Sequence, residues 1–319
     1  MIVRFGFVAM SLELYNASPS KTMSYTNYAK LTNDRSRLFR LKKLTEENLE
    51  NTLRILINAH ANGIEVYRIT SKLVPLSTHK DVIDWDYTSE LSQQFQKIKE
   101  YLDETGIRIS AHPDHFTVLT SPREEVIEAS VRDLIYHDRI LRAMGKGPEG
   151  KLVLHVGGVY KDKEKAMDIF KSNFSALPQN IKERIILEND DKSYTASETL
   201  KLCQELNVPM VFDVHHHLCN PDGLTVEELL APVFNTWENQ NLPPKIHYST
   251  PKSQSSIRSH ADDIDSEAFY EFLVKAKKLD KDFDVMLEAK NKDVALLKLM
   301  DDLKHYKDIK FIRGAVIEF

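Results

Sequence analysis

Cysteine is scarce in this chain of 319 residues, with only Cys203 and Cys219 present. Two cysteines cannot supply the disulfide framework of small secreted proteins, so the sequence favours a reducing compartment. No apolar run approaches the roughly 20 residues that span a bilayer, and the first apolar stretch is too short for a signal peptide. We therefore expect a cytoplasmic protein without a membrane segment.

Glycine and proline are few and scattered, at ten and twelve residues, and no low-complexity segment, linker or internal repeat divides the chain. With 42% hydrophobic and 29% charged residues, residues 1–319 suit one large α/β domain. The net charge of -5 shows no overall attraction to nucleic acid, although it says little about the field at one cleft.

Basic residues do gather in loops that follow predicted strands, where nucleic-acid contact and ordinary solvated charge explain them about equally well. They are Arg35, Arg37, Arg40, Lys42, Lys43, Lys161, Lys163, Lys165, Lys252 and Arg258.

Eight short apolar runs recur along the chain, each separated from the next by a segment long enough for a helix. They are Arg4 to Val8, Gly63 to Ile69, Ile107 to Ala111, Leu152 to Val156, Ile185 to Leu187, Met210 to Phe212, Lys245 to Tyr248 and Asp284 to Leu287. Most of the intervening segments carry apolar residues at i, i+3, i+4 spacing. This alternation predicts a single (β/α)8 TIM barrel of the α/β class, with its active site at the carboxyl ends of the strands.

The predicted helices surround the barrel. We expect the first to begin at Thr45 and end near Gly63, because Thr-Glu-Glu resembles a capped first turn. Later helices are expected at 89–105, 122–144, 163–177, 195–206, 225–237, 266–279 and 293–304. The aperiodic stretch from Asn16 to Lys43 is predicted to be a functional loop over the strand ends. The tail from Ile309 to Phe319 is expected to add a strand or a packing segment.

Histidines and carboxylates are concentrated where the predicted strands end. Of twelve histidines, only those at positions 60, 137 and 305 fall within predicted helices, where they are ordinary structural residues. Glu188, Asp213 and Glu288 stand at strand ends too, and would repel one another if they were buried without counter-charge. Bound cations remove that repulsion, and imidazole with carboxylate suits manganese, zinc or iron. The pattern predicts a metal centre.

Two local motifs refine this prediction. Lys245 and His247 are two residues apart in one strand, so both side chains project to the same side. A protonated lysine would repel metal ions, and a salt bridge to a carboxylate is the alternative. In the segment FDVHHH, Asp213 and His216 can approach neighbouring ions, whereas His215 and His217 are expected to orient ligands or to be exposed.

Several clustered ions favour phosphodiester hydrolysis, in which one ion activates water and others neutralise the phosphate. The same barrel with fewer ions isomerises or epimerises sugars, and that is the main alternative. A non-catalytic protein that binds damaged DNA is a third possibility.

Nine sequence segments together resemble the UV damage endonuclease family, relatives of the metal-dependent apurinic endonucleases among the xylose-isomerase-like barrels. The segments are RFGFVAMSLEL, YRITSKLVPLSTH, RISAHPDHF, LVLHVGG, ILENDD, FDVHHH, KIHYS, RSHADD and MLEAK. The resemblance runs the full length of the chain and is highly specific when the segments are taken jointly.

The resemblance implies three divalent metal ions, manganese before zinc or magnesium. The first ion would be held by His112, His155 and Glu188. The second would be held by Glu188, Asp213, His247 and Glu288, and the third by His216, His260 and Lys245. In this family the matching lysine can be carboxylated, which turns a repelling cation into an anionic ligand. The catalytic residues would be Glu188, Lys245, His247 and Glu288.

The family's reaction is hydrolysis of the phosphodiester immediately 5′ to a pyrimidine dimer or related lesion in double-stranded DNA, leaving a 3′-hydroxyl and a 5′-phosphate. His115 and Phe116 match a pair inserted into the duplex, where many relatives carry glutamine and tyrosine. Phe7 and Ser11 stand where relatives often have tyrosine and asparagine near the lesion, and His79 matches a histidine that lines the site. We expect a monomer without an obligate protein partner.

Overall fold

Eight parallel strands close into a barrel in the computed structural model, which describes all 319 residues. Each strand pairs with the next along the chain, and β1 pairs with both β2 and β8 to complete the ring. The strands are β1 (Ile2–Val8), β2 (Val66–Ile69), β3 (Arg108–Ala111), β4 (Lys151–His155), β5 (Ile185–Glu188), β6 (Met210–Asp213), β7 (Lys245–Tyr248) and β8 (Phe283–Leu287). The predicted single (β/α)8 barrel is therefore confirmed.

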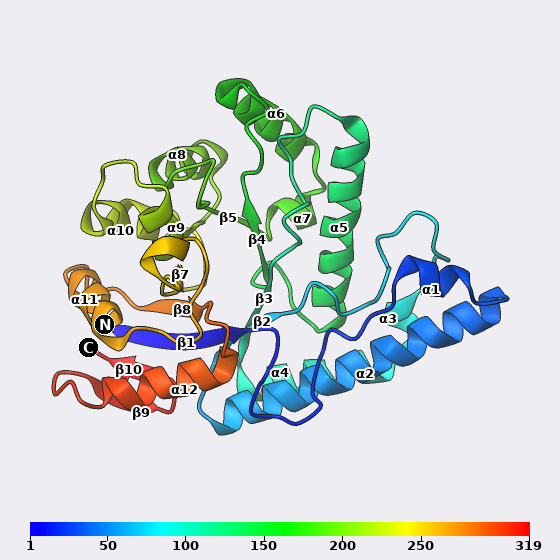
Figure 1. Ribbon diagram of the computed structural model, residues 1–319, viewed down its shortest axis with the longest axis horizontal. Coiled ribbons are helices and arrows are strands. Elements are labelled where there is room, and N and C mark those ends of the chain that lie inside the picture. Colours follow the sequence, from blue (N-terminus) through cyan, green and yellow to red (C-terminus); the bar gives the residue numbers. More distant parts are fainter.

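The helices between the strands cover the outside of the barrel (Figure 1). They are α1 (Tyr25–Ala29), α2 (Asp34–Ala61), α3 (Tyr87–Glu90), α4 (Ser92–Thr105), α5 (Glu124–Ala143), α6 (Lys163–Ala176), α7 (Gln179–Lys182), α8 (Ala196–Leu206), α9 (Val214–Cys219), α10 (Val226–Asn235), α11 (Ser266–Lys277) and α12 (Lys292–Leu303). None of these helices has the length and apolar character needed to cross a membrane.

The strands are almost wholly buried because the helices cover their outer face while the barrel interior is filled by side chains. The rings of Phe7 and Tyr67, on the neighbouring strands β1 and β2, pack at 5.4 Å between centroids. On the outside, Phe5 of β1 packs against Phe269 of α11 at 5.5 Å. The apolar runs in the sequence are thus the buried strands of the barrel.

The first long helix begins eleven residues earlier than the sequence predicts, at Asp34 rather than Thr45. Its N-cap is Asn33, whose side chain accepts a hydrogen bond from the amide of Ser36. Thr45 is buried in the helix interior, where its hydroxyl donates to the carbonyl of Leu41. The stretch from Asn16 to Lys43 is therefore not one loop, since it contains α1 and the first turns of α2.

The C-terminal tail forms a hairpin of β9 (Lys310–Arg313) and β10 (Val316–Glu318). Strand β10 pairs antiparallel with the first residues of β1, and the chain end lies beside the N-terminus (Figure 1). The expected extra strand is thus present, together with a second one. The short helices α7 and α9, like α1, were not predicted from the sequence, and α9 follows directly on β6.

Candidate metal centre

Glu188 is the last residue of β5, and its carboxylate lies between the histidines at the ends of neighbouring strands. Its carboxylate is 1% exposed. Its Oε2 lies 3.1 Å from His112 Nε2 and 3.6 Å from His155 Nε2. His155 ends β4 directly beside Glu188 in the sheet register, and His112 follows β3. These three residues bring ligand atoms within 4.8 Å of one another and form the first candidate ion site.

A second group shares Glu188 and extends across β6, β7 and β8. His247 Nδ1 lies 2.8 Å from Glu188 Oε1 and 3.2 Å from Glu288 Oε1. Asp213 stands opposite His247 in the register of β6 and β7. Ligand atoms of Glu188, Asp213, His247 and Glu288 all lie within 4.8 Å of one another. The two groups are the same sets that the family resemblance implies for the first and second ions.

Backbone groups orient several of these side chains. The Nδ1 atom of His112 lies 2.9 Å from the carbonyl of Pro113, which leaves Nε2 directed at Glu188. Asn189 ties the ends of β5 and β6 together, because its side chain donates to the carbonyl of Asp213 and accepts from the amide of Asp213, both at 2.9 Å. Such outer partners fix ring and carboxylate orientation before an ion binds.

The pKa values of the three carboxylates in the centre are shifted in different directions by their surroundings. Burial favours the protonated form of Glu188, but His247 and His155 outweigh it and hold its pKa well below the usual range. Burial raises the pKa of Asp213 well above its usual range, since His216 opposes the shift only in part. For Glu288, burial is likewise outweighed, mainly by Arg68, and the pKa is lowered.

Unsatisfied polar atoms in the centre fit a set of metal ligands. Asp213 Oδ2, His247 Nε2 and His155 Nδ1 are buried without a hydrogen-bond partner. Buried polar atoms are rarely left unpaired in native proteins. Imidazole nitrogen and carboxylate oxygen together suit divalent ions of the manganese and zinc type. The residues present therefore fit bound divalent ions.

The residues expected to hold a third ion are only partly assembled. His216 Nδ1 lies 3.6 Å from Asp213 Oδ2 and 2.9 Å from the carbonyl of Asn189. His260 Nδ1 lies 2.6 Å from the carbonyl of Glu288. Lys245 is fully buried, and its Nζ donates to Ser110 Oγ at 2.8 Å. A third ion at these side chains stays a prediction.

His215 and His217 are both buried rather than exposed. His215 Nδ1 lies 2.8 Å from Ser249 Oγ, and its Nε2 lies 2.6 Å from the carbonyl of Ile257. His217 Nε2 lies 3.0 Å from the carbonyl of Leu224. These hydrogen bonds hold the segments around α9 together. Neither histidine belongs to the two ligand groups.

The residues expected to contact DNA lie in three settings. Phe116 is 74% exposed, and its ring lies 4.0 Å from that of His115 between centroids, at a tilt of 42°, beyond the end of β3. His79 stacks on Tyr25 at 4.3 Å, in the connection after β2. Phe7 is only 1% exposed and packs on Tyr67 of β2.

Ser11 is also buried, and its hydroxyl accepts a hydrogen bond from the amide of Leu14. Contact of Phe7 or Ser11 with a lesion stays a prediction, and both side chains are buried in this structure. The strand and loop that carry them are packed rather than open.

Arg68 is a site residue that the sequence analysis missed. It lies in β2 and its guanidinium pairs with the Glu288 carboxylate, with 11% and 13% of the two side chains exposed. An arginine within an apolar strand was the available signal, because a charge at a buried position needs a partner. Asn189, in the segment ILENDD, carried no comparable signal.

Comparison with known proteins agrees with this geometry. Residues 3–319 match the family described as UV-endonuclease UvdE. A UV DNA damage endonuclease of Bacillus cereus strain G9842 is 43% identical over 319 residues, with both chains covered in full. The crystal structure of SacUVDE superimposes with a TM-score of 0.85 at 31% identity, covering 95% of this chain and 98% of the other.

Endonuclease IV from Thermus thermophilus shares the fold, with a TM-score of 0.58 at 13% identity over 95% of this chain and 99% of that one. This last likeness concerns the barrel alone. The family match, in contrast, spans nearly every residue, including both ligand groups around Glu188. The chain therefore belongs to the UV-endonuclease UvdE family.

Proposed function

We propose that this protein is a metal-dependent endonuclease that incises double-stranded DNA at UV-induced lesions. The observation that carries the proposal is the pair of ligand groups sharing Glu188, in a chain that is 43% identical over its whole length to a UV DNA damage endonuclease. The barrel fold alone does not distinguish this activity from sugar isomerisation, since one fold hosts many functions.

His112, His155 and Glu188 would hold one divalent ion, and Glu188, Asp213, His247 and Glu288 a second. Ions bound there would supply an activated water and neutralise the charge that develops on the phosphate, as in other clustered sites, with manganese the proposed metal. The buried Glu188 carboxylate serves both sites and keeps its charge because the surrounding histidines lower its pKa. Glu288, whose pKa is also lowered, would add a second charged carboxylate, and Asp213, whose pKa is raised by burial, would lose a proton on binding an ion.

His216, His260 and Lys245 are proposed to hold a third ion, with Lys245 carboxylated. Burial lowers the pKa of Lys245 well below its usual range, and Arg108 adds to the shift. A neutral amine can react with carbon dioxide, whereas an ammonium cannot. Carboxylation would also remove the cation that opposes metal binding, which supports this part of the proposal.

His115 and Phe116 are proposed to insert into the duplex at the lesion. Their rings contact each other at a tilt, and both side chains are exposed. Unstacking a damaged step costs less than unstacking intact DNA, so a wedge of this kind favours lesions by shape. His79 and its partner Tyr25 lie in a neighbouring loop and would line the DNA path.

The proposed cut is at the phosphodiester immediately 5′ to the dimer, leaving a 3′-hydroxyl and a 5′-phosphate. We further propose that residues 1–319 act as one domain and a monomer in the cytoplasm. Both cysteines are free thiols, which supports a reducing compartment.

An incision assay tests the proposal. Purified protein with manganese is incubated with an end-labelled duplex that carries one thymine dimer, and with the same duplex undamaged. We expect a single cut 5′ to the dimer only in the damaged duplex, and none after chelation. Glu188→Gln should abolish it, because it removes the charge shared by both sites. Glu238→Gln makes the same change at an exposed position and should cut normally.

Two results would contradict the proposal. One is the absence of incision with manganese, magnesium and zinc alike. The other is lesion-specific binding that is unchanged in Glu188→Gln and never followed by a cut, which would make the protein a damage-binding module. Conversion of a ketose under the same conditions would instead favour the sugar isomerase.

A further inference from the structure

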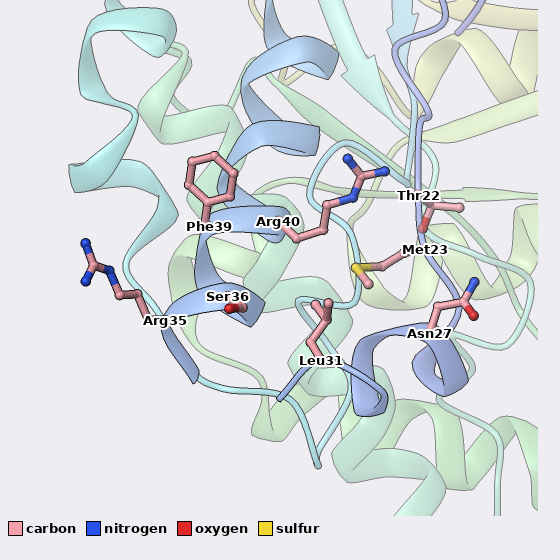
Figure 2. Close-up of a pocket in the computed structure, with 8 residues that line it drawn as sticks. All are labelled: Thr22, Met23, Asn27, Leu31, Arg35, Ser36, Phe39 and Arg40. Carbon is pink, nitrogen blue, oxygen red and sulfur yellow. The ribbon is translucent and has the colours of Figure 1, made fainter. Parts of the chain in front are cut away.

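An open cavity of about 670 Å³ lies between α1 and the first turns of α2, away from the metal centre. It is lined by Thr22, Met23, Asn27, Leu31, Arg35, Ser36, Phe39 and Arg40. Ser36 and Arg40 are four residues apart on the face of α2 that looks toward α1, and Arg40 extends toward Thr22 (Figure 2). No acidic side chain lines this cavity.

The basic residues of this segment divide into paired and free ones. Arg37 pairs with Asp34 at 3.0 Å and lies over the ring of Tyr28. Lys42 pairs with Glu90 at 3.3 Å. Arg35 and Arg40 are exposed and make no ion pair, as is also true of Lys30 and Lys43, which do not line the cavity. The two arginines of this segment without an ion-pair partner are thus both lining residues, with Arg40 reaching toward Thr22 and Arg35 extending to the opposite side of α2 (Figure 2).

The cavity borders the face of the barrel that carries the metal ligands. Helix α1 lies in the connection after β1, and it is fixed to the connection after β2 by two contacts. Tyr25 stacks on His79 at 4.3 Å, and the hydroxyl of Tyr28 accepts a hydrogen bond from the amide of Ile83 at 2.9 Å. Connections that follow strands lie at their carboxyl ends, so this platform stands beside the proposed DNA path.

We propose that this cavity binds the sugar-phosphate backbone of the duplex that flanks the lesion. Guanidinium groups match phosphate geometry, and Arg35 and Arg40 are free to make such contacts. The hydroxyl of Ser36 can donate to phosphate oxygens, while Met23 and Leu31 offer apolar surface to deoxyribose. Asp34 is close in sequence but is neutralised by Arg37 and does not line the cavity. This inference rests on the proposed DNA substrate.

The test measures affinity for an undamaged duplex of about 30 base pairs by fluorescence anisotropy over a series of KCl concentrations. Each phosphate contact contributes about 0.9 to the slope of log affinity against log salt. Arg35→Gln with Arg40→Gln should therefore reduce that slope by about 1.8 and weaken binding on the order of tenfold at physiological salt. Replacing both by lysine should retain most of the slope, because the charge stays.

The matched control is Lys278→Gln with Lys307→Gln, which removes the same charge from two exposed residues between helices and the strands that follow. This control should keep the wild-type slope. If the double arginine variant, folded by its melting temperature, matches the control in slope and affinity, the inference is overturned. The incision assay on wild-type protein tests the proposed function separately. If wild type cuts damaged DNA but the arginine variant and the lysine control bind DNA alike, only the proposed backbone contact is refuted.

Discussion

Arg68 reaches the carboxylates of the metal centre from β2 and pairs with Glu288 in a mostly buried setting. The pair explains how metal-free protein tolerates Glu288 beside Glu188 and Asp213. Removing one partner of a buried pair leaves an uncompensated charge, which is costly. The arginine therefore acts as an internal counter-ion when no metal is bound.

Arg68→Gln is expected to lower the free energy of unfolding by roughly 2–4 kcal/mol in the presence of a chelator. Manganese should restore part of this loss, since bound ions supply the missing positive charge. Urea unfolding with chelator and with manganese measures both values. Lys99→Gln, which breaks an exposed pair with Asp103, is the control and should be close to wild type. Equal stability of Arg68→Gln and wild type in chelator would refute this role.

His216 should make metal binding depend on pH. Burial lowers its pKa, but Asp213, Glu188 and Glu288 outweigh burial and raise the pKa to about 9. In metal-free protein at pH 7 this histidine is therefore protonated, and it must lose the proton to act as a ligand. Metal affinity should accordingly increase as the pH rises toward 9.

Calorimetry in two buffers of different ionisation enthalpy counts the protons that manganese displaces. At pH 7, wild type should release about one proton more than His216→Gln. The control His305→Gln alters an exposed histidine outside the centre and should release as many as wild type. Identical counts in wild type and His216→Gln would contradict a protonated His216 in the metal-free protein.

Among the elements, β1 and β2 approach so closely that one of them requires glycine. A Cβ atom on Gly6 would overlap the carbonyl oxygen of Val66 on the neighbouring strand. The barrel closes at β1, which is flanked by β2 and β8, so the strands have little freedom to separate.

Gly6→Ala is expected to lower the free energy of unfolding by about 3 kcal/mol, the cost of overpacking a rigid core. Gly106→Ala is a suitable comparison, because its added methyl group meets nothing and costs only the strain of a positive φ of 70°, about 1–2 kcal/mol. Thermal unfolding compares the two. The account of barrel closure fails if Gly6→Ala proves the milder change.

Helices and strands could be predicted from the sequence where the hydrophobic periodicity and the residue composition agreed. The prediction was less accurate where one residue suits two different structural roles. Thr45 followed by two glutamates resembles a helix start, but its hydroxyl bonds to the carbonyl four residues back, inside α2. Gly63 was assigned to a strand, yet its φ of 70° ends the helix and β2 begins only at Val66. Local patterns do not reveal which of the two roles applies.

A metal centre at the strand ends could be anticipated because a parallel barrel brings all carboxyl strand ends to one rim, whereas the division into ligand groups followed from the family resemblance. The sequence did not show which residues at this rim are accessible and which are buried. Phe7 and Arg68 both lie on barrel strands, but one packs in the core while the other reaches Glu288. That difference depends on the pairing register across the barrel, which a single strand does not specify.

For the whole molecule, metal binding should be coupled to stability. A ligand that binds only the folded state stabilises it by about 2.7 kcal/mol at a hundredfold excess over its dissociation constant. Manganese should therefore raise the melting temperature of wild type clearly, and chelation should reverse the effect. Glu188→Gln should show a much smaller rise, because it weakens both ligand groups. A rise equal to that of wild type would place the ions elsewhere.

The most direct test of the central claim is anomalous diffraction from crystals soaked in manganese, recorded at the manganese absorption edge. The account predicts one peak bounded by His112, His155 and Glu188 and another bounded by Glu188, Asp213, His247 and Glu288. Peaks only at other positions, or no peak at Glu188 at saturating manganese, would contradict it.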